Sequence, residues 1–142
     1  MSSMRMTATA RRIGDGLTHH IDVNGRHTIV TDEPERLGGS DLGPAPHELL
    51  AATLASCVAT MIAMYAQNRE WDIGQTSVEV TYDPDSSPRL FAIEIRLPSS
   101  VTTEQRRRLE RVAETCPVRR ALEADCVFEE RILISMDMPR AA

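Results

Sequence analysis

The sequence has few aromatic residues, few cysteines and no cluster of positive charge. Only 4% of its residues are aromatic, and its net charge is −5. Nucleic-acid-binding surfaces are basic and often carry aromatic side chains for stacking, so this composition argues against a nucleic-acid partner. The arginine run at positions 106–108 is followed by Glu110 and Glu114, which is typical of a solvated helix face.

The three cysteines are odd in number and far apart, so they do not form the framework of a disulfide-rich secreted domain. The N-terminal segment lacks the apolar stretch of a signal peptide. No CxxC or HxxxH spacing occurs, so we predict no metal site and no cofactor. With 142 residues, of which 42% are apolar and 26% charged, the chain is typical of a single soluble domain covering residues 1–142. We expect it to be cytoplasmic.

What the sequence does have is one long apolar segment, from Pro46 to Gln67. Its length, its content of Ala, Leu and Met, and the absence of Gly predict a helix. Apolar residues lie on every side of that helix, which predicts that it is buried at the centre of the protein. A membrane span is the alternative. The segment is at the lower length limit for a span and stands alone among amphipathic elements, so we expect no membrane.

The polar residues of this apolar segment share one narrow face of the predicted helix. They are separated by three, four and seven positions, which places them on one side: Thr53, Ser56, Thr60 and Gln67. Cys57 lies on the same face and is therefore the candidate reactive cysteine. The competing interpretation is that Cys57 is a small apolar core residue, as a lone buried cysteine usually is.

Short alternating segments on both sides of the helix predict antiparallel strands. Residues 6–13, 17–23 and 26–31 should form a meander, because Asn24-Gly25 is a strong hairpin signal. Residues 76–82 and 90–97 should form a second hairpin. A last strand is predicted at residues 127–135, directly after Cys126, which we interpret as a structural cysteine.

Cys116 is placed by the proline that follows it. Leu109 and Cys116 stand at helical spacing, so Cys116 ends the buried stripe of an amphipathic helix that Thr102 or Thr103 caps. Pro117 interrupts that helix and suits the first position of a new short helix, residues 117–123. Cys116 then lies at a helix N-terminus, where exposed N–H groups favour a thiolate.

Four motifs in a fixed order resemble the OsmC/Ohr family along nearly the whole chain: Gly38-Gly39, Gly43-Pro44-x-Pro46-x-Glu48-Leu49-Leu50, Ala55-Ser56-Cys57 and Cys116-Pro117-Val118. The resemblance implies an α+β fold with antiparallel sheets around the buried helix, in an intertwined homodimer. It also implies a thiol peroxidase that reduces organic or inorganic hydroperoxides. In the family, the residue matching Cys57 is attacked by peroxide and the one matching Cys116 resolves it as a disulfide. An external dithiol then supplies the electrons.

The hydroperoxide-specific members of that family use an arginine held by a glutamate, and this sequence departs from their pattern. His47 stands at the glutamate position and Glu48 follows it. Arg36 is our preferred arginine, with Arg12 as the alternative. On one unbroken helix, Glu48 would lie roughly 13 Å from Cys57 along the axis and on the opposite face. We therefore expect Glu48 and its arginine to serve the Cys57 of the partner subunit.

Two other functions remain open. The first is a non-catalytic OsmC-like protein that binds a small apolar molecule at the dimer interface or senses oxidation, to which His47 in place of the acid points. The second is a cysteine hydrolase that uses Cys57 with His47. Ten residues of the same helix would separate those two side chains, so an intact helix excludes direct contact within one chain.

Overall fold

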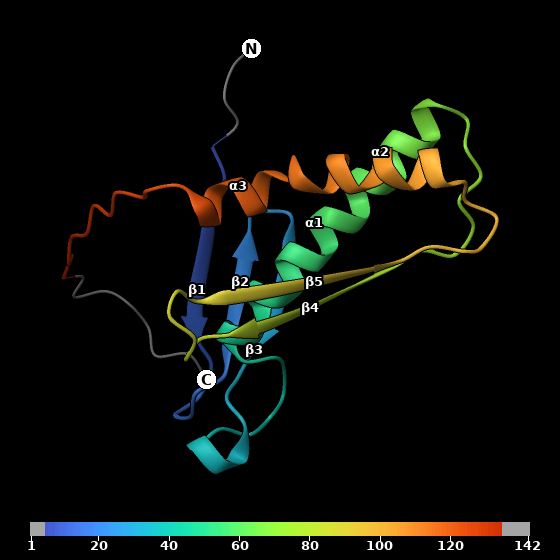
Figure 1. The fold of residues 1–142 in the computed structure, drawn as a ribbon. Coiled ribbons are helices and arrows are strands. Elements are labelled where there is room, and N and C mark those ends of the chain that lie inside the picture. Colours follow the sequence, from blue (N-terminus) through green and yellow to red (C-terminus); the bar gives the residue numbers. More distant parts are fainter. Residues whose placement is uncertain (1–4, 135–142) are drawn as a thin grey trace. The chain divides into compact units, whose positions relative to one another are not determined.

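The computed structural model describes residues 5–134, and the chain divides into two compact units. One unit holds residues 5–49 together with residues 130–134, and the other holds residues 50–129 (Figure 1). The single-domain assignment stays a prediction. The elements run in the order β1 (Ala8–Arg12), β2 (His19–Val23), β3 (His27–Thr31), η1 (Glu35–Leu37), α1 (Pro46–Asn68), β4 (Ser77–Asp83), β5 (Leu90–Arg96), α2 (Thr103–Glu114) and α3 (Pro117–Glu123).

The first unit is built on the predicted three-stranded meander, with strand order β1-β2-β3 and both pairs antiparallel. The hairpin signal between β2 and β3 forms the expected tight turn, because Asn24 and Gly25 both have positive φ angles, 53° and 66°. The Asn24 side chain also accepts a hydrogen bond from the Thr7 backbone N–H at 2.8 Å. This contact ties the start of β1 to the turn.

The loop between β3 and α1 is organised by the buried carboxylate of Asp32. Its side chain accepts hydrogen bonds from the Thr18 hydroxyl at 2.9 Å and from the Glu33 backbone N–H at 2.8 Å. The Leu42 backbone N–H also donates to it, at 3.3 Å, which closes the loop on itself. Gly39 is required where the loop folds back, because a Cβ atom there would collide with the backbone carbonyl of Glu33. The Gly-rich stretch therefore has a steric role.

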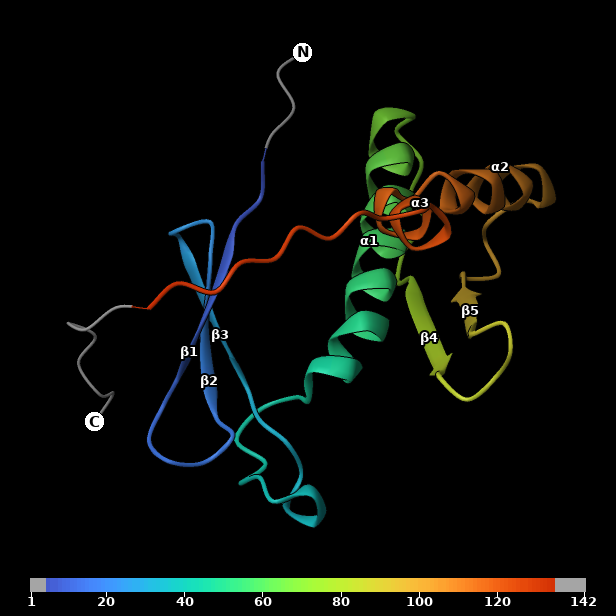
Figure 2. The ribbon, with the colours of Figure 1, turned by 90° about the vertical axis from the view of Figure 1, so that its left-hand side faces the viewer.

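The second unit is centred on α1, which is unbroken from Pro46 to Asn68. Four of its apolar residues, spaced four apart, are buried: Leu54, Val58, Ile62 and Ala66. They pack with Leu109 and Ala113 of α2 and against the partly buried side chains of the β4–β5 hairpin. In Figures 1 and 2 the hairpin runs beside α1, while α2 and α3 follow one another along the chain.

The elements after α1 match their predictions closely. β4 and β5 pair antiparallel, with Val80 opposite Ile93 and Tyr82 opposite Phe91 on the partly buried face. Thr102 is the N-cap of α2 and forms a capping box with Gln105. α3 begins at Pro117 and ends at Glu123, as predicted.

α1 is the central helix of the second unit, as predicted, but the single chain does not bury it on every side. One stripe is covered, whereas Leu50 and Met64 are 36% and 53% exposed. A helix that is apolar all round needs cover on more than one face, and the described residues of this chain supply it along one stripe. By length and composition alone α1 could also cross a membrane. Its buried stripe packs as the core helix of a globular domain does.

The predicted strand at residues 127–135 is also wrong within the described residues. Residues 127–134 form no strand, and Ser135 lies outside the part of the chain that the structure describes. The apolar side chains of this segment are largely exposed, with Phe128 at 91% and Ile134 at 92%. A strand requires a neighbour to accept and donate its backbone hydrogen bonds, and this segment is not paired with one.

Candidate functional site

The structure brings Cys57 and Cys116 together. Cys57 lies in the middle of α1 and is partly buried, whereas Cys116 is fully buried and is the residue from which α3 begins. Both belong to the core of the second unit, Cys116 as a core residue and Cys57 packed against it. The fold thus places the middle of α1 against the start of α3. The chemical roles of the two residues stay predictions.

The two thiols are coupled through a hydrogen bond. Burial raises the pKa of the Cys57 thiol above its usual range, and the hydrogen bond with Cys116 raises it further. The backbone N–H of Val118 acts in the opposite direction, because it donates to the Cys57 sulfur and favours the thiolate. Negative charge on Cys116 adds a smaller upward contribution. Proton release from one thiol thus depends on the state of the other.

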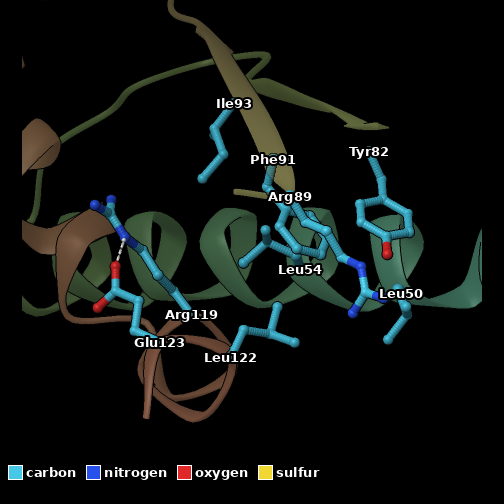
Figure 3. A pocket seen from close by; sticks show the side chains of 9 residues that line it. All are labelled: Leu50, Leu54, Tyr82, Arg89, Phe91, Ile93, Arg119, Leu122 and Glu123. Carbon is cyan, nitrogen blue, oxygen red and sulfur yellow. Dashed lines mark hydrogen bonds and ion pairs between the residues drawn. The ribbon is translucent and has the colours of Figure 1, made fainter. Parts of the chain in front are cut away.

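A pocket of about 860 Å³ lies in the second unit, between α1, the β4–β5 hairpin and α3. Figure 3 shows its apolar walls, to which α1 contributes Leu50 and Leu54, and it shows Tyr82 and Arg89 near Leu50. The rings of Tyr82 and Phe91 are stacked, with centroids 4.5 Å apart. The remaining lining residues are Ile93, Arg119, Leu122 and Glu123.

The pocket and the thiol pair occupy adjacent turns of the same two helices. Leu54 lines the pocket and Cys57 is three residues further along α1, on a neighbouring part of the same face. In the same way, Arg119 lines the pocket three residues after Cys116. The two cysteines are not part of the pocket lining, but each lies one helical turn from a residue that is.

The sequence reasoning missed Arg119 and Glu123. The Arg119 Nε atom donates to the Glu123 carboxylate at 2.8 Å, across one turn of α3 (Figure 3). The carboxylate raises the pKa of Arg119, and the charges of Glu114 and Cys116 add smaller upward contributions. Arg119 is thus a cation within electrostatic range of Cys116. The spacing of four residues between Arg119 and Glu123 predicts the ion pair. It does not predict that the pair lies beside a cysteine.

The other sequence-predicted site residues lie in the first unit. Glu48 is in the first turn of α1, and Arg36 is in the short helix η1. Arg12 donates hydrogen bonds to the carbonyls of Asp15 and Gly16, so its guanidinium holds a turn. Because Arg12 is engaged in these hydrogen bonds, Arg36 stays our preferred candidate for the arginine that acts on Cys57. The roles of Glu48 and Arg36 stay predictions.

The unbroken α1 helix bears on the alternative that the protein is a cysteine hydrolase using Cys57 with His47. Ten residues separate His47 from Cys57 along this helix, which corresponds to roughly 15 Å of axial rise. Direct proton transfer between their side chains within one chain is therefore excluded, and the cysteine hydrolase is disfavoured. The same geometry places Glu48 and Cys57 on different turns and faces of α1.

The interpretation of Cys126 as a structural cysteine finds no support in its surroundings. Cys126 is exposed, and its Sγ atom lies 3.7 Å from the carbonyl oxygen of Ala121. Residues 5–134 contain no group of three or more His, Cys, Asp or Glu side chains that could hold a metal ion.

Comparison with known proteins adds a family and several similar folds. A family model described as OsmC-like protein matches residues 38–131. A structure from Psychrobacter arcticus 273-4, named for osmotic stress induction and detoxification response, is 30% identical. The match covers 85% of this chain and 90% of that one, with a TM-score of 0.67.

Two further structures are similar in fold at lower identity. The organic hydroperoxide resistance protein OsmC from Legionella pneumophila is 21% identical, with a TM-score of 0.58 and coverage of 86% of this chain and 91% of that one. The organic hydroperoxide resistance protein OhrB from Bacillus subtilis is 24% identical, with a TM-score of 0.52 and coverage of 86% and 93%. No curated protein matches the chain.

Proposed function

The chain belongs to the OsmC-like family, and from that premise we propose that it is a thiol peroxidase that reduces organic hydroperoxides through Cys57 and Cys116. The observation that carries the proposal is that the fold brings Cys57 and Cys116 together in one core, one helical turn from residues that line an apolar pocket. Relatives with a similar fold are named for organic hydroperoxide resistance, which supports the same redox role.

The reaction begins at Cys57, because this thiol is partly exposed whereas Cys116 is fully buried. The Cys57 thiolate attacks the O–O bond of the hydroperoxide ROOH, and the sulfur is oxidised to a sulfenic acid. The alkoxide leaving group takes the proton of the neighbouring Cys116 thiol and departs as the alcohol ROH. The Cys116 thiolate formed in this way then faces the sulfenic sulfur.

The second step closes the disulfide. The Cys116 thiolate attacks the Cys57 sulfur, the S–S bond forms, the S–O bond breaks and hydroxide leaves. An external dithiol returns both cysteines to the reduced state by thiol–disulfide exchange. In the partly buried pair, the Val118 N–H is the donor that favours the attacking thiolate of Cys57.

The walls of the pocket favour an organic peroxide over hydrogen peroxide. Leu50, Leu54 and Ile93 are apolar, as are Phe91 and Leu122. Burying the hydrocarbon part of a substrate against such walls contributes roughly 25 cal/mol per Å² of apolar surface. Hydrogen peroxide has no apolar part and gains nothing from them.

We further propose that the active form is a homodimer in which Glu48 and Arg36 serve the Cys57 of the partner subunit. Within one chain, burial raises the pKa of the Cys57 thiol and the contacts with Cys116 raise it further, so a cation from outside the second unit would favour its thiolate. The helix geometry of α1 supports this arrangement, because Glu48 cannot reach Cys57 along its own helix.

Intact-mass analysis after one equivalent of cumene hydroperoxide tests the function. The wild-type protein should lose two mass units, and peptide mapping should find a Cys57–Cys116 disulfide with Cys126 free. Cys116→Ser should gain one oxygen at Cys57 and over-oxidise with excess peroxide, whereas Cys57→Ser should leave both other thiols reduced. Cys126→Ser is the matched control and should behave as wild type. Slow oxidation of all three thiols without a preferred pair would overturn the proposal.

A non-catalytic role as an oxidation sensor is the second candidate, because burial raises the pKa of Cys57 and a high pKa slows its reaction at neutral pH. The two functions differ in turnover. With a dithiol in excess, a peroxidase consumes many equivalents of cumene hydroperoxide per subunit. A sensor consumes about one equivalent and then stays oxidised until it is reduced by its own partner.

A further inference from the structure

We propose that Arg119, held in place by Glu123, favours the charged form of Cys116 and thereby sets the rate at which the disulfide closes. This inference rests on the proposed peroxidase function and assigns a residue to its second step. It concerns a different arginine and a different cysteine from the Arg36–Cys57 pairing that the family resemblance predicts.

The position of Arg119 carries the inference. Arg119 lies one turn after Cys116 on α3, and its side chain is only 37% exposed. Its Nε atom donates to the Glu123 carboxylate at 2.8 Å, the shortest of the ion pairs among the described residues. This contact fixes the guanidinium, and the negative charge of Cys116 acts favourably on it.

The ion pair itself contributes little to the stability of the helix. Exposed pairs spaced four residues apart stabilise a helix only slightly, because solvent screens the two charges. Glu123 is 60% exposed and Arg119 is half-buried, so the pair is close to that case. Removing the guanidinium should therefore change the chemistry of Cys116 far more than it changes folding.

Arg119 acts at the second step, in which the disulfide closes. When the alkoxide takes the proton of Cys116, a negative charge appears on a sulfur that is fully buried. Burial disfavours this charge, and a fixed cation nearby favours it. Arg119 thus stabilises the thiolate that attacks the Cys57 sulfenic acid. Without it, the sulfenic acid persists and meets a second peroxide molecule, which oxidises it to a sulfinic acid.

The test compares Arg119→Ala with two matched variants. Arg120→Ala removes an equal charge from an exposed neighbour on the same helix, and Arg119→Lys keeps the charge beside Cys116. Each protein is mixed with cumene hydroperoxide under stopped flow, and the sulfenic acid and disulfide are quantified by quenching and mass spectrometry. Circular dichroism and thermal melting confirm that each variant is folded.

We expect Arg119→Ala to close the disulfide about tenfold more slowly than wild type, because a nearby opposite charge stabilises an attacking anion by about this factor. Its sulfinic acid fraction should rise at a given excess of peroxide. Arg120→Ala should match wild type, Arg119→Lys should recover most of the closure rate, and Glu123→Gln should lie between wild type and Arg119→Ala.

The outcomes separate this inference from the proposed function. If Cys57 is oxidised rapidly in Arg119→Ala and the disulfide closes at the wild-type rate, the role of Arg119 is wrong and the peroxidase stands. If wild-type Cys57 fails to form a sulfenic acid at all, the proposed function fails, and the inference fails with it. Equal slowing in Arg119→Ala and Arg120→Ala would show an effect of net charge on α3 and would also overturn the inference.

Discussion

Cys57 is held between contacts that act on its proton in opposite directions. Its burial and its hydrogen bond with Cys116 raise the pKa of the thiol, and the Val118 N–H lowers it. A thiol with a raised pKa is less ionised at neutral pH, so its reaction with electrophiles speeds up only as the pH rises towards that pKa. The state of Cys116 therefore sets how reactive Cys57 is before any peroxide arrives.

Cys116→Ala should lower the pKa of Cys57, because it removes both the hydrogen bond and the negative charge by which Cys116 raises it. The rate of Cys57 alkylation by iodoacetamide, followed by peptide mass spectrometry across pH 6–10, should reach half its maximum at a lower pH than in wild type. Cys126→Ala is the control and should leave the profile unchanged. A midpoint that moves to higher pH would show that Cys116 acts on Cys57 in the opposite sense.

Arg36→Ala should move the same profile in the other direction. If Arg36 serves the Cys57 of the partner subunit, its removal takes away a cation that favours the thiolate, so the pKa of Cys57 rises and peroxide reduction slows. A shift of one pKa unit would slow the reaction about tenfold at neutral pH. Arg12→Ala is the comparison, since Arg12 donates to the carbonyls of a turn. An unchanged alkylation profile in Arg36→Ala would exclude Arg36 as the partner of Cys57.

Residue-level prediction from the sequence succeeded where a local rule was sufficient. Pro117 placed Cys116 at the start of a helix because proline restricts the residue before it and suits the first helical position. Prediction from the sequence did not identify Asp32 as the organising residue of its loop, because its partners Thr18 and Leu42 are distant in the sequence. Although burial acts to raise the pKa of Asp32, the hydrogen bonds that it accepts lower it overall. Such a cluster exists only once the chain has folded.

At the scale of elements, α2 depends on its N-terminal capping box. The Thr102 hydroxyl accepts a hydrogen bond from the Gln105 backbone N–H at 3.1 Å, and the Gln105 side chain accepts one from the Thr102 N–H at 2.9 Å. These contacts satisfy two backbone donors that a helix start otherwise leaves unpaired. The helix they stabilise carries Leu109 and Ala113 into the core and leads the chain to Cys116.

Thr102→Ala should lower the free energy of unfolding by about 1 kcal/mol, because alanine cannot accept the N-cap hydrogen bond. Chemical denaturation monitored by circular dichroism measures the change. Thr103→Ala is the matched control, since Thr103 is the first residue inside α2 and is not the cap. Equal losses in the two variants would show that the capping box contributes nothing specific.

The elements themselves were largely predictable, because their signals are local. Hydrophobic alternation located both hairpins. The helical spacing of apolar residues located α2, with its N-cap predicted at Thr102 or Thr103. The segment at residues 127–134 shows where that reasoning fails. Its apolar composition predicts a strand, but a strand forms only beside another strand, and alternation says nothing about which neighbour is available. Which strands pair therefore depends on the fold as a whole and not on the local sequence.

At the scale of the whole molecule, the single chain leaves much apolar surface exposed. Met64 on α1 is 53% exposed, and Phe128 and Ile132 are 91% and 87% exposed. In the first unit, the buried residues within the described range are Thr31, Asp32 and Ala45, which is a small core for a three-stranded sheet. Exposed apolar surface of this extent is typical of an interface.

We predict that a second copy of the chain covers this surface, so the protein should sediment as a homodimer at micromolar concentration. Sedimentation equilibrium measures the mass directly. If folding depends on association, the thermal midpoint should also rise with protein concentration, as mass action requires. A monomer with a concentration-independent melting temperature would contradict both the intertwined dimer and a site shared between subunits.

The position of the two thiols, one in α1 and one before α3, has a consequence for the entropy of the unfolded chain. A bond between Cys57 and Cys116 would close a loop of about 60 residues, and in the loop-closure model this stabilises the folded state by roughly 4 kcal/mol. The oxidised protein should therefore melt roughly 10 °C above the reduced one. Differential scanning calorimetry with and without a dithiol measures this, and Cys57→Ser should show no difference. Each catalytic cycle would then alternate between a chain that the Cys57–Cys116 disulfide cross-links and a chain without this cross-link.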